Sequence, residues 1–463
     1  MFMVLLKYVP ANRRLPALAL FFLGIFVVSL FLVDLDSAEE VGKGLEHAQG
    51  RGSWGSGLGA HREAGEADAA PASGIQITHG KISTGYNYKM FVYEEDIPRE
   101  LYGSFKHDLH CQSEYSGVEA LFPAILKRLD VYTPFSDTAD YYVVPVMTEC
   151  FLNKKLLMGK DFNWAVKDLN SLFESTLDEI QSSYPHWSRT EGRDHIFVFP
   201  SERGPSLLNA ANMQRISKSI FLTGLTSYRP TVFEPWKDIT VPAFNRPENG
   251  SDSDGSVQGD TSKENRDIFV HFRGAVPGLE DKQPSGLTHE LQMALEEYGL
   301  DKEYVFKDLD EDCPDLACVR REMKRSTFCL CPGGDFEGWS LRLYKAISAG
   351  CIPVILADQA ELPFAQLLDY SKFSVKILER EVDRVPMLLN EMGPTKIKNK
   401  QAELRKAKEK LSWDYTIRDA KGNPMWKGAS ALDSLLKVLQ LKLRFMRNSP
   451  YHFWVKEENA VTE

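Results

Sequence analysis

The chain has 463 residues, of which 55 are Lys or Arg and 65 are Asp or Glu, giving a formal net charge of −10. This acidic balance argues against a protein that coats nucleic acid by attracting its phosphates. The length suits two or three domains, and 43% hydrophobic and 26% charged residues fit neither wholesale disorder nor a polytopic membrane protein. Seven cysteines are too few for a miniprotein built on disulfides.

An uncharged apolar stretch, Leu15–Val33, lies near the start of the chain. Its length falls within the ~17–25 residues that a helix needs to cross a bilayer core. Three cations precede it and four acids follow, and positive charge beside a span tends to stay cytoplasmic. We therefore expect a single-pass type II layout, with a cytoplasmic tail over residues 1–14, a transmembrane anchor over residues 15–33 and a lumenal remainder. A cleaved signal peptide is the alternative, although its apolar region is typically ~7–15 residues long.

Two tracts without apolar periodicity divide the rest of the chain. Residues 34–86 are rich in Gly, Ala and Glu, so we expect a flexible stem. Residues 246–266 are polar and contain several glycines, which indicates a disordered interdomain linker or, alternatively, a long surface loop. Asn249 begins an N-glycosylation acceptor triplet within that linker. The tracts leave two folded domains, at residues 87–245 and 267–445.

Both folded parts alternate short apolar or aromatic runs, typical of strands, with segments of helical length. The expected strands are Lys89–Tyr93, Asp140–Val146, His195–Phe199, Asp267–Phe272, Thr327–Cys331, Cys351–Leu356 and Phe373–Ile377. Expected helices include one that begins with a Ser116/Glu119 capping box, and two more at Gln401–Leu411 and Ala429–Leu443. Such strands imply parallel sheets covered on both faces. The predicted fold class is therefore α/β, with two doubly wound, Rossmann-like domains that face one another across a cleft.

The most specific pattern, Ser326–Phe364, runs in the order strand, Gly-rich loop, helix, strand and acidic loop. Gly333 and Gly334 allow the loop backbone to approach a ligand closely, and Ser340 stands where the N-cap of the helix is expected. A helix N-terminus presents amide donors and a positive dipole end, which suit a diphosphate. Arg342 in the first helical turn adds a cationic fork.

This order resembles the C-terminal half of the exostosin-type glycosyltransferase family. The matching residues are Ser326, Phe328–Leu330, Pro332, Gly333, Ser340, Arg342, Gly350–Ile355 and Leu362–Phe364, with His271–Gly274 upstream. Weaker similarity reaches Phe91–Glu94, Cys111 with Tyr115 and Glu119, and Thr138–Pro145. The resemblance therefore spans roughly Lys89 to Phe373 and is densest towards its C-terminal end.

The resemblance implies a GT-B architecture, with an N-terminal acceptor domain and a C-terminal nucleotide-sugar domain. It also implies a Golgi-resident, inverting transferase that needs no metal and no cofactor besides its nucleotide-sugar co-substrate, for which we expect a uridine diphosphate (UDP) sugar. The expected partners are that donor, a glycan or glycoprotein acceptor and the membrane, with no nucleic acid. Homo-oligomers and hetero-oligomers both stay open.

The predicted donor-binding residues are Gly333, Gly334 and Ser340 of this segment, together with Arg273, Arg342 and Glu361. Arg273 follows a predicted strand at its carboxyl edge, where open α/β sheets bind ligands; the alternative is an arginine that ties down a loop. Arg342 is assigned to the diphosphate, with pairing to an acid of the same loop as its alternative. Glu361 is expected to accept hydrogen bonds from the donor ribose, with a solvated loop acid as its alternative.

The acceptor side gives a weaker pattern for the general base that an inverting transfer needs. Glu149 lies just past the strand Asp140–Val146 and is the predicted base. The carboxylate of Glu119 is already used by the expected capping box. His107 and His110 are further candidates for lining an acceptor cleft, although satisfied or exposed histidines are the more common case.

Two acidic pairs, Asp252–Asp254 and Asp308–Asp310, have the D-x-D spacing that holds a divalent cation in metal-dependent sugar transferases. Neither pair follows a buried strand, and the cysteines lack paired C-x-x-C spacing. No metal site is therefore predicted.

The cysteines suggest lumenal disulfides. The candidate pairs are Cys111 with Cys150 and Cys313 with Cys318. Cys329 and Cys351 lie in buried strands and are expected to be packed thiols. Because seven is odd, at least one thiol stays free or pairs with another chain.

Taken together, these patterns predict an inverting, metal-independent glycosyltransferase that moves a sugar from a nucleotide diphosphate donor to a glycan or glycoprotein. Arg273, Ser340 and Arg342 would neutralise the leaving diphosphate. The alternative is a catalytically silent exostosin-like subunit that stabilises a partner transferase. A glycan-binding module is a third interpretation, but it leaves the phosphate cradle unexplained.

Overall fold

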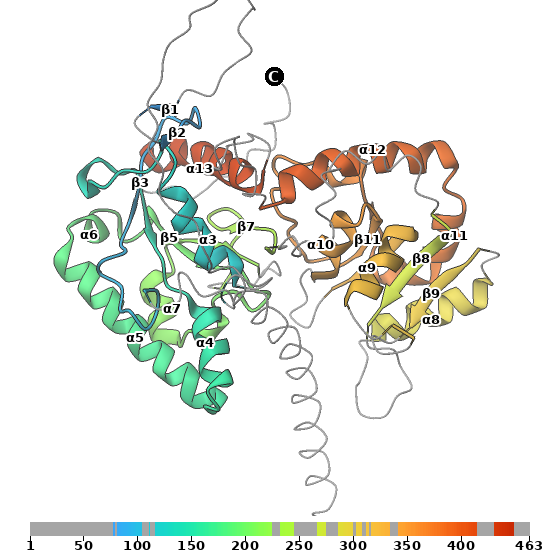
Figure 1. Ribbon diagram of the computed structural model, residues 1–463, viewed down its shortest axis with the longest axis horizontal. Coiled ribbons are helices and arrows are strands. Elements are labelled where there is room, and N and C mark those ends of the chain that lie inside the picture. Colours follow the sequence, from blue (N-terminus) through green and yellow to red (C-terminus); the bar gives the residue numbers. More distant parts are fainter. Residues whose placement is uncertain are drawn as a thin grey trace, which may run out of the picture. The chain divides into compact units, whose positions relative to one another are not determined.

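The computed structural model is an α/β protein with two parallel five-stranded sheets (Figure 1). It describes residues 77–78, 81–103, 111, 116–224, 232–244, 266–274, 286–299, 302–307, 312–313, 316–333, 341–413 and 430–448. Strands β1 (Ile77–Thr78) and β2 (Lys81–Ile82) pair antiparallel within the segment 34–86 predicted as a stem. The predicted anchor and Asn249 lie outside the described residues. Within the described part of the chain, no helix is long and apolar enough to cross a membrane.

The first sheet contains five parallel strands that lie in the same order as in the chain. They are β3 (Met90–Val92), β4 (Tyr141–Val144), β5 (His195–Phe199), β6 (Ile220–Thr223) and β7 (Ile239–Thr240). The helices of this part are α3 (Gly117–Leu126), α4 (Thr148–Leu157), α5 (Phe162–Ser183), α6 (His186–Thr190) and α7 (Ala210–Ile216). The three predicted strands of this half are confirmed as β3, β4 and β5.

Both faces of the first sheet are buried, as its near-continuous apolar strands require. Successive strand residues point to opposite faces. On β4, Tyr141 and Val143 belong to the same core as residues of α3 and of α13 (Ala431–Asn448). Tyr142 and Val144 belong to a second core with residues of α4, α5 and α7.

The second sheet has the order β12-β11-β10-β8-β9, and all its strands are parallel. Its strands are β8 (Ile268–Arg273), β9 (Tyr304–Lys307), β10 (Ser326–Pro332), β11 (Ile352–Leu356) and β12 (Val375–Lys376). Its helices are α8 (Gly286–Tyr298), α9 (Leu316–Arg325), α10 (Leu341–Ser348), α11 (Val385–Asn390) and α12 (Pro394–Leu411). The four predicted strands are confirmed as β8, β10, β11 and a short β12.

The direction of winding differs between the two sheets. In the second sheet the chain passes from β8 to β9 on one side and then crosses to β10 on the other side of β8. This reversal makes the second sheet doubly wound, as predicted. The described strands of the first sheet follow chain order without a reversal, so the prediction of a doubly wound sheet is wrong for them. Strand order depends on which neighbours pair, and the apolar pattern of a strand does not encode that choice.

The C-terminal helix α13 packs against the first sheet. The hydroxyls of Tyr88 and Tyr141 donate to the backbone oxygens of Leu436 and Leu439 on α13, at 2.8 and 2.6 Å. The predicted helix Ala429–Leu443 is therefore confirmed as α13. The predicted helix Gln401–Leu411 is the second half of α12.

The capping box predicted at Ser116 and Glu119 is wrong. Helix α3 does begin after Ser116, but the Ser116 side chain makes no capping hydrogen bond. The Glu119 carboxylate instead accepts hydrogen bonds from the backbone amides of Glu149 and Cys150, at 3.0 and 3.2 Å. These amides lie in the first turn of α4, where a helix has no internal acceptors for them.

Three disulfides join six of the seven cysteines. The predicted pairs Cys111–Cys150 and Cys313–Cys318 are confirmed. The expectation of packed thiols at Cys329 and Cys351 is wrong, because these two form a disulfide between the neighbouring strands β10 and β11, with 5.8 Å between their Cα atoms. Burial alone does not distinguish a thiol from a disulfide. The odd cysteine is Cys331, which is buried and free.

Candidate active site

The candidate donor site lies at the carboxyl edge of the second sheet, beside the reversal in strand order. β8 ends at Arg273 and its parallel neighbour β10 ends at Pro332, just before Gly333. In open α/β sheets, ligands bind at this edge and at this reversal. Of the predicted donor residues, Arg273 therefore ends β8 and Gly333 directly follows β10, at the edge where a ligand is expected.

Arg342 reaches the same place from a different element. It lies in the first turn of α10, as predicted, and its Nε donates to the backbone oxygen of Arg273 at 3.3 Å. Its guanidinium carbon is 4.7 Å from the ring centroid of Phe272. A Cβ atom on Gly274 would come within 2.8 Å of Nη2 of Arg342, so only glycine leaves room for this position. The structure thus brings together the two predicted arginines.

Arg273 is held by Glu322, a residue of α9 that the sequence patterns do not single out. Nε of Arg273 donates to Oε2 of Glu322 at 2.7 Å, and Nη2 donates to Oε1 at 2.8 Å. His271 contributes a third contact, with Nε2 at 3.1 Å from Oε2. Arg273 itself is 4% exposed. The strand end therefore carries a buried arginine with a fixed orientation.

The charges of this cluster follow from its contacts. The hydrogen bond and charge of Arg273 lower the pKa of Glu322, so Glu322 is ionised at neutral pH. Burial lowers the pKa of His271, so its ring is neutral there. An ionised carboxylate only accepts hydrogen bonds, so Nε2 of His271 must carry the ring proton. Nδ1 is then an acceptor, and it is buried with no hydrogen-bond partner among the described residues.

Of the four other predicted donor residues, Gly333 and Glu361 lie in the described part of the chain. The amide of Gly333 donates to the backbone oxygen of Leu356 at 2.9 Å, so it links β10 to β11. Glu361 is half-buried in the loop after β11, at the same sheet edge, and its charge contributes to raising the pKa of Tyr370, which burial raises most. Gly334 and Ser340 lie outside the described residues.

The first sheet places the predicted base at its own carboxyl edge. Glu149 lies in the first turn of α4, just past β4, and is 4% exposed. Its Oε1 accepts from Nη1 of Arg203 at 2.9 Å, and Arg203 follows β5. Among the described residues no hydrogen-bond partner is found for its buried Oε2 by geometry, although the hydroxyl of Ser201 lies close enough to act on the pKa of this carboxyl. Burial raises the pKa of Glu149, although the charge of Arg203 and hydrogen bonding from Ser201 and Arg203 oppose this shift.

Glu119 is a second buried carboxylate beside Glu149. In addition to two backbone amides, it accepts from the hydroxyl of Thr148 at 3.0 Å. Burial raises the pKa of Glu119 to about 8, and the nearby charge of Glu149 adds to this shift. Glu119 therefore holds the start of α4, and with it the backbone of Glu149. The alternative candidates His107 and His110 lie outside the described residues.

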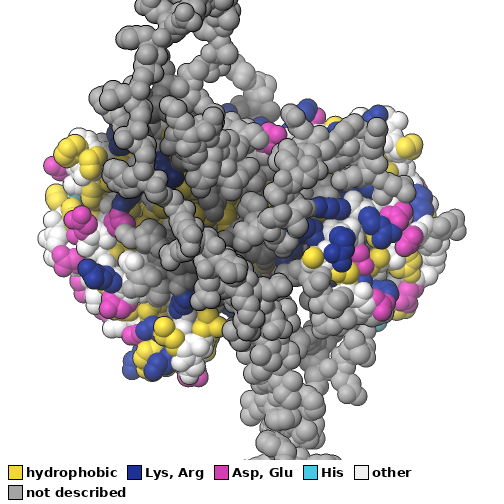
Figure 2. All heavy atoms as spheres, in the orientation of Figure 1, with side chains coloured by type: hydrophobic (Ala, Val, Ile, Leu, Met, Phe, Trp, Pro, Cys, Tyr) yellow, Lys and Arg dark blue, Asp and Glu magenta, His cyan; other side chains and the backbone are white. Residues whose placement is uncertain are grey.

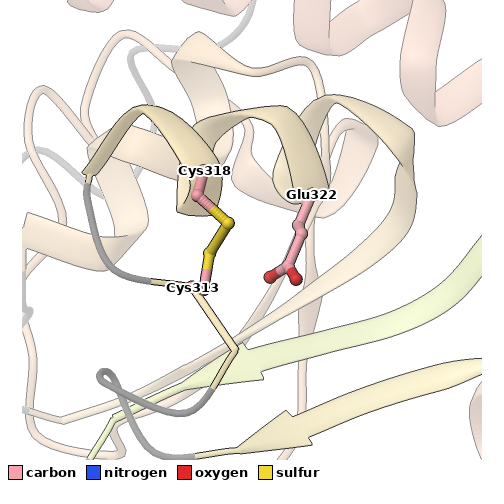
Figure 3. Close-up of side chains that lie close together, drawn as sticks. All are labelled: Cys313, Cys318 and Glu322. Atoms are coloured by element: carbon pink, nitrogen blue, oxygen red, sulfur yellow. A yellow bond between two sulfur atoms is a disulfide. The ribbon is translucent and has the colours of Figure 1, made fainter.

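One group of potential metal ligands occurs among the described residues, namely Cys313, Cys318 and Glu322, whose ligand atoms lie within 4.8 Å of one another (Figure 3). The two sulfur atoms are joined in a disulfide, and Glu322 accepts hydrogen bonds from Arg273 and His271. This group therefore does not offer a metal site. The predicted D-x-D pairs, Asp252–Asp254 and Asp308–Asp310, lie outside the described residues.

Sequence reasoning missed two partners in these sites, Glu322 and Arg203. A usable signal exists for Arg203, because it follows a predicted strand just as Arg273 does. Glu322 lies in the middle of a charged helix, and only its spacing of four residues from Cys318 places the two on one helical face. Nothing in the sequence links that face to β8.

Comparisons with known proteins agree with this architecture. A family model described as the Exostosin GT47 domain matches residues 85–392. The "Probable glucuronoxylan glucuronosyltransferase IRX7" of Arabidopsis thaliana is 28% identical over 371 residues, which cover 77% of this chain and 78% of the relative. The "Probable beta-1,4-xylosyltransferase IRX10L" of the same plant is 29% identical over 325 residues, covering 68% and 73%. The "Probable glucuronosyltransferase Os03g0107900" of Oryza sativa subsp. japonica is 26% identical over 356 residues, covering 74% and 79%. This chain therefore belongs to the exostosin GT47 family of glycosyltransferases.

Proposed function

We propose that this exostosin-family chain transfers a sugar from a nucleotide diphosphate donor, a UDP-sugar, to a glycan acceptor, with inversion and without a metal ion. The observation that carries the donor half is the meeting of Arg273 and Arg342 at the strand-order reversal of the second sheet. Two fixed guanidinium groups suit the two phosphates of such a donor. The names of the relatives, which include glucuronosyltransferases and a xylosyltransferase, support a polysaccharide acceptor.

The charge for donor binding is local. On the face seen in Figure 2, Lys and Arg side chains are interspersed with Asp and Glu, and the whole chain has a net charge of −10. A broad positive field therefore does not attract the anionic donor. Arg273, Arg342 and the start of α10 must supply the attraction at the site itself.

The proposed reaction assigns complementary tasks to the two sheets. As the acceptor oxygen bonds to the anomeric carbon, the bond from that carbon to the diphosphate breaks, and the diphosphate leaves with the electron pair. Arg273 and Arg342 neutralise the charge that develops on the diphosphate. Oε2 of Glu149 is the proposed acceptor of the hydroxyl proton, because Oε1 is engaged by Arg203. Burial raises the pKa of Glu149 towards the range in which a general base works well.

The same proposal places the protein in the Golgi membrane as a type II chain, with residues 15–33 as its anchor. The three disulfides support a lumenal position for the folded part, because disulfides persist in oxidising compartments. The alternative of a catalytically silent subunit is not favoured, because a partner-stabilising role does not require two arginines at a ligand-binding edge.

Nucleotide binding tests the donor half. The purified full chain should gain thermal stability with UDP, by about 2.7 kcal/mol at a concentration 100 times the Kd. Arg342→Ala should abolish this gain. The absence of stabilisation by UDP, GDP or any other nucleotide diphosphate would contradict the proposed function.

Glu149→Gln tests the acceptor half. This variant should still bind UDP but lose sugar transfer, since an amide cannot accept the hydroxyl proton. Glu174→Gln, at an exposed acid of α5, is the matched control and should transfer normally. Transfer by Glu149→Gln at the wild-type rate would remove Glu149 as the base.

A further inference from the structure

We infer that Glu322 positions Arg273 for the donor diphosphate, and that the Cys313–Cys318 disulfide fixes the helix that carries Glu322. This inference rests on the proposed nucleotide diphosphate site. It assigns a role to a carboxylate that lies outside the glycine-rich loop and makes no proposed contact with substrate.

The geometry of the Arg273–Glu322 pair favours positioning. Glu322 contacts Arg273 through Nε and Nη2, which form one edge of the planar guanidinium. The second edge of the guanidinium, formed by Nη1 and the other N–H of Nη2, therefore points in a different direction from Glu322. A carboxylate in this position holds the guanidinium in one plane and one orientation. The second edge of Arg273 therefore points in one fixed direction, in which we infer that the ligand lies.

Glu322 is itself held at both oxygens. Oε1 accepts from Arg273, and Oε2 accepts from both Arg273 and the protonated Nε2 of His271. Arg273 and His271 both belong to β8 and are nearly fully buried. Rotation of the carboxylate would break at least one of these hydrogen bonds, each of which involves an ionised partner.

The disulfide holds the helix from which Glu322 projects. Cys318 and Glu322 lie four residues apart on α9, so both face the same way, as Figure 3 shows. Cys313 precedes α9 and is joined to Cys318, with 5.6 Å between their Cα atoms. The covalent bond therefore ties the chain entering α9 to the first turn of that helix, one turn before Glu322.

Within the described part of the chain, the other charged groups near Arg273 have different main contacts. Asp312 lies close enough for its pKa to be lowered in part by Arg273, but its main partner is Lys307, at 2.8 Å. Arg342 contacts the backbone of Arg273 rather than its guanidinium. Among the described residues, Glu322 is the acid for which bidentate hydrogen bonds to Arg273 are found.

The first experiment compares UDP binding by Glu322 variants using titration calorimetry on the full chain. Glu322→Gln should weaken UDP binding about tenfold or more, because an amide cannot accept from both nitrogens of Arg273. Glu322→Asp keeps the charge and should restore part of the affinity. Asp267→Asn is the matched control. Asp267 lies just before β8, at the end away from Arg273, and forms an exposed ion pair with Arg325, the last residue of α9. This variant should bind UDP like the wild type.

A double-mutant cycle separates positioning from a merely structural role. If Glu322 acts through Arg273, then Arg273→Ala and the double variant with Glu322→Gln should bind UDP equally weakly. A structural Glu322 would instead lower the affinity further in the Arg273→Ala background. In transfer assays, Glu322→Gln should raise the KM for the donor and leave the KM for the acceptor unchanged.

The outcomes distinguish this inference from the proposed function. If wild type binds no nucleotide diphosphate, the proposed function fails. If wild type binds UDP and a folded Glu322→Gln variant binds it equally well, Glu322 is not the positioning residue. If Glu322→Gln does not fold, Glu322→Asp and the serine variants of Cys313 and Cys318 carry the test. Unchanged UDP affinity in all of the folded variants would overturn the inference.

Discussion

Gly274 shows how a single missing side chain can define a binding site. A Cβ there would meet Nη2 of Arg342 and Cζ of Phe272, both at 2.8 Å. Nη2 ends a flexible side chain and can move at small cost, whereas Cζ belongs to the buried ring of Phe272, whose displacement costs some stability. We predict that Gly274→Ala displaces Arg342 and weakens UDP binding about fivefold to tenfold, while the melting temperature changes by only a few degrees.

A glycine in an open position provides the control for this prediction. Gly393 precedes α12, and no atom of the described residues lies within 4 Å of a Cβ built on it. Gly393→Ala should therefore leave UDP affinity unchanged. Wild-type affinity in Gly274→Ala, measured by calorimetry, would show that Arg342 does not need its present position.

Glu119 makes the stability of the first sheet depend on pH. Burial raises its pKa to about 8 in the folded protein, compared with ~4.3 in an unfolded chain. The folded state therefore holds a proton that the unfolded state releases. The stabilisation from this group is complete below about pH 4 and is lost as the pH rises towards 8.

The variant Glu119→Gln cannot titrate and isolates this effect. Its free energy of unfolding, subtracted from that of wild type, should give a difference that falls between about pH 5 and pH 8. The slope should be at most ~1.4 kcal/mol per pH unit, the value for one proton. Urea unfolding across this range measures it, and a difference that is constant or rises with pH would contradict the raised pKa.

At the level of elements, the Cys329–Cys351 disulfide joins β10 to β11 beside the glycine-rich loop. Cys331 lies two residues from Cys329 and is buried. We predict that alkylation labels one cysteine per chain under denaturing, non-reducing conditions and that this cysteine is Cys331. Peptide mass spectrometry checks the site, and three labelled cysteines would contradict the bond between the strands.

The strands were largely predictable from the sequence, and their arrangement was not. His195–Phe199 and Cys351–Leu356 are apolar enough to indicate buried parallel strands by themselves, and both are confirmed with small shifts at the ends. The sequence pattern predicts that the Glu119 carboxylate caps its own helix, α3. The backbone amides that donate to it instead belong to α4, some thirty residues further along the chain. Contacts of this kind depend on packing, which local patterns do not encode.

The predicted donor-binding residues were easier to find from the sequence than the side chains that hold them in place. Arg273 and Arg342 follow local rules for strand ends and helix starts, and the structure brings them together. Glu322 holds Arg273, and Arg203 contacts the predicted base Glu149. Both of these partners come from other elements of the fold. A sequence therefore reveals the residues that face a ligand sooner than those that hold them.

For the whole molecule, α13 is the element that extends the C-terminal part of the chain onto the first sheet. Leu436 on α13 is fully buried, while its neighbour Lys437 is exposed. We predict that Leu436→Asp destabilises the protein by several kcal/mol, because it buries an unpaired charge. Lys437→Gln, which removes the exposed charge without reversing it beside Asp433, should change stability by at most ~0.5 kcal/mol. Denaturant unfolding of both variants checks this, and equal stabilities would contradict the packing of α13.

The most direct test of the central claim, that the reversal edge of the second sheet binds the donor of a sugar transfer, is a nucleotide-sugar hydrolysis assay. The full chain and its Arg342→Ala variant are incubated with a panel of UDP and GDP sugars, and the released nucleotide diphosphate is measured. We predict that wild type hydrolyses at least one UDP-sugar and that Arg342→Ala loses this activity. Release from none of the donors by wild type, or equal release by the variant, would contradict the claim.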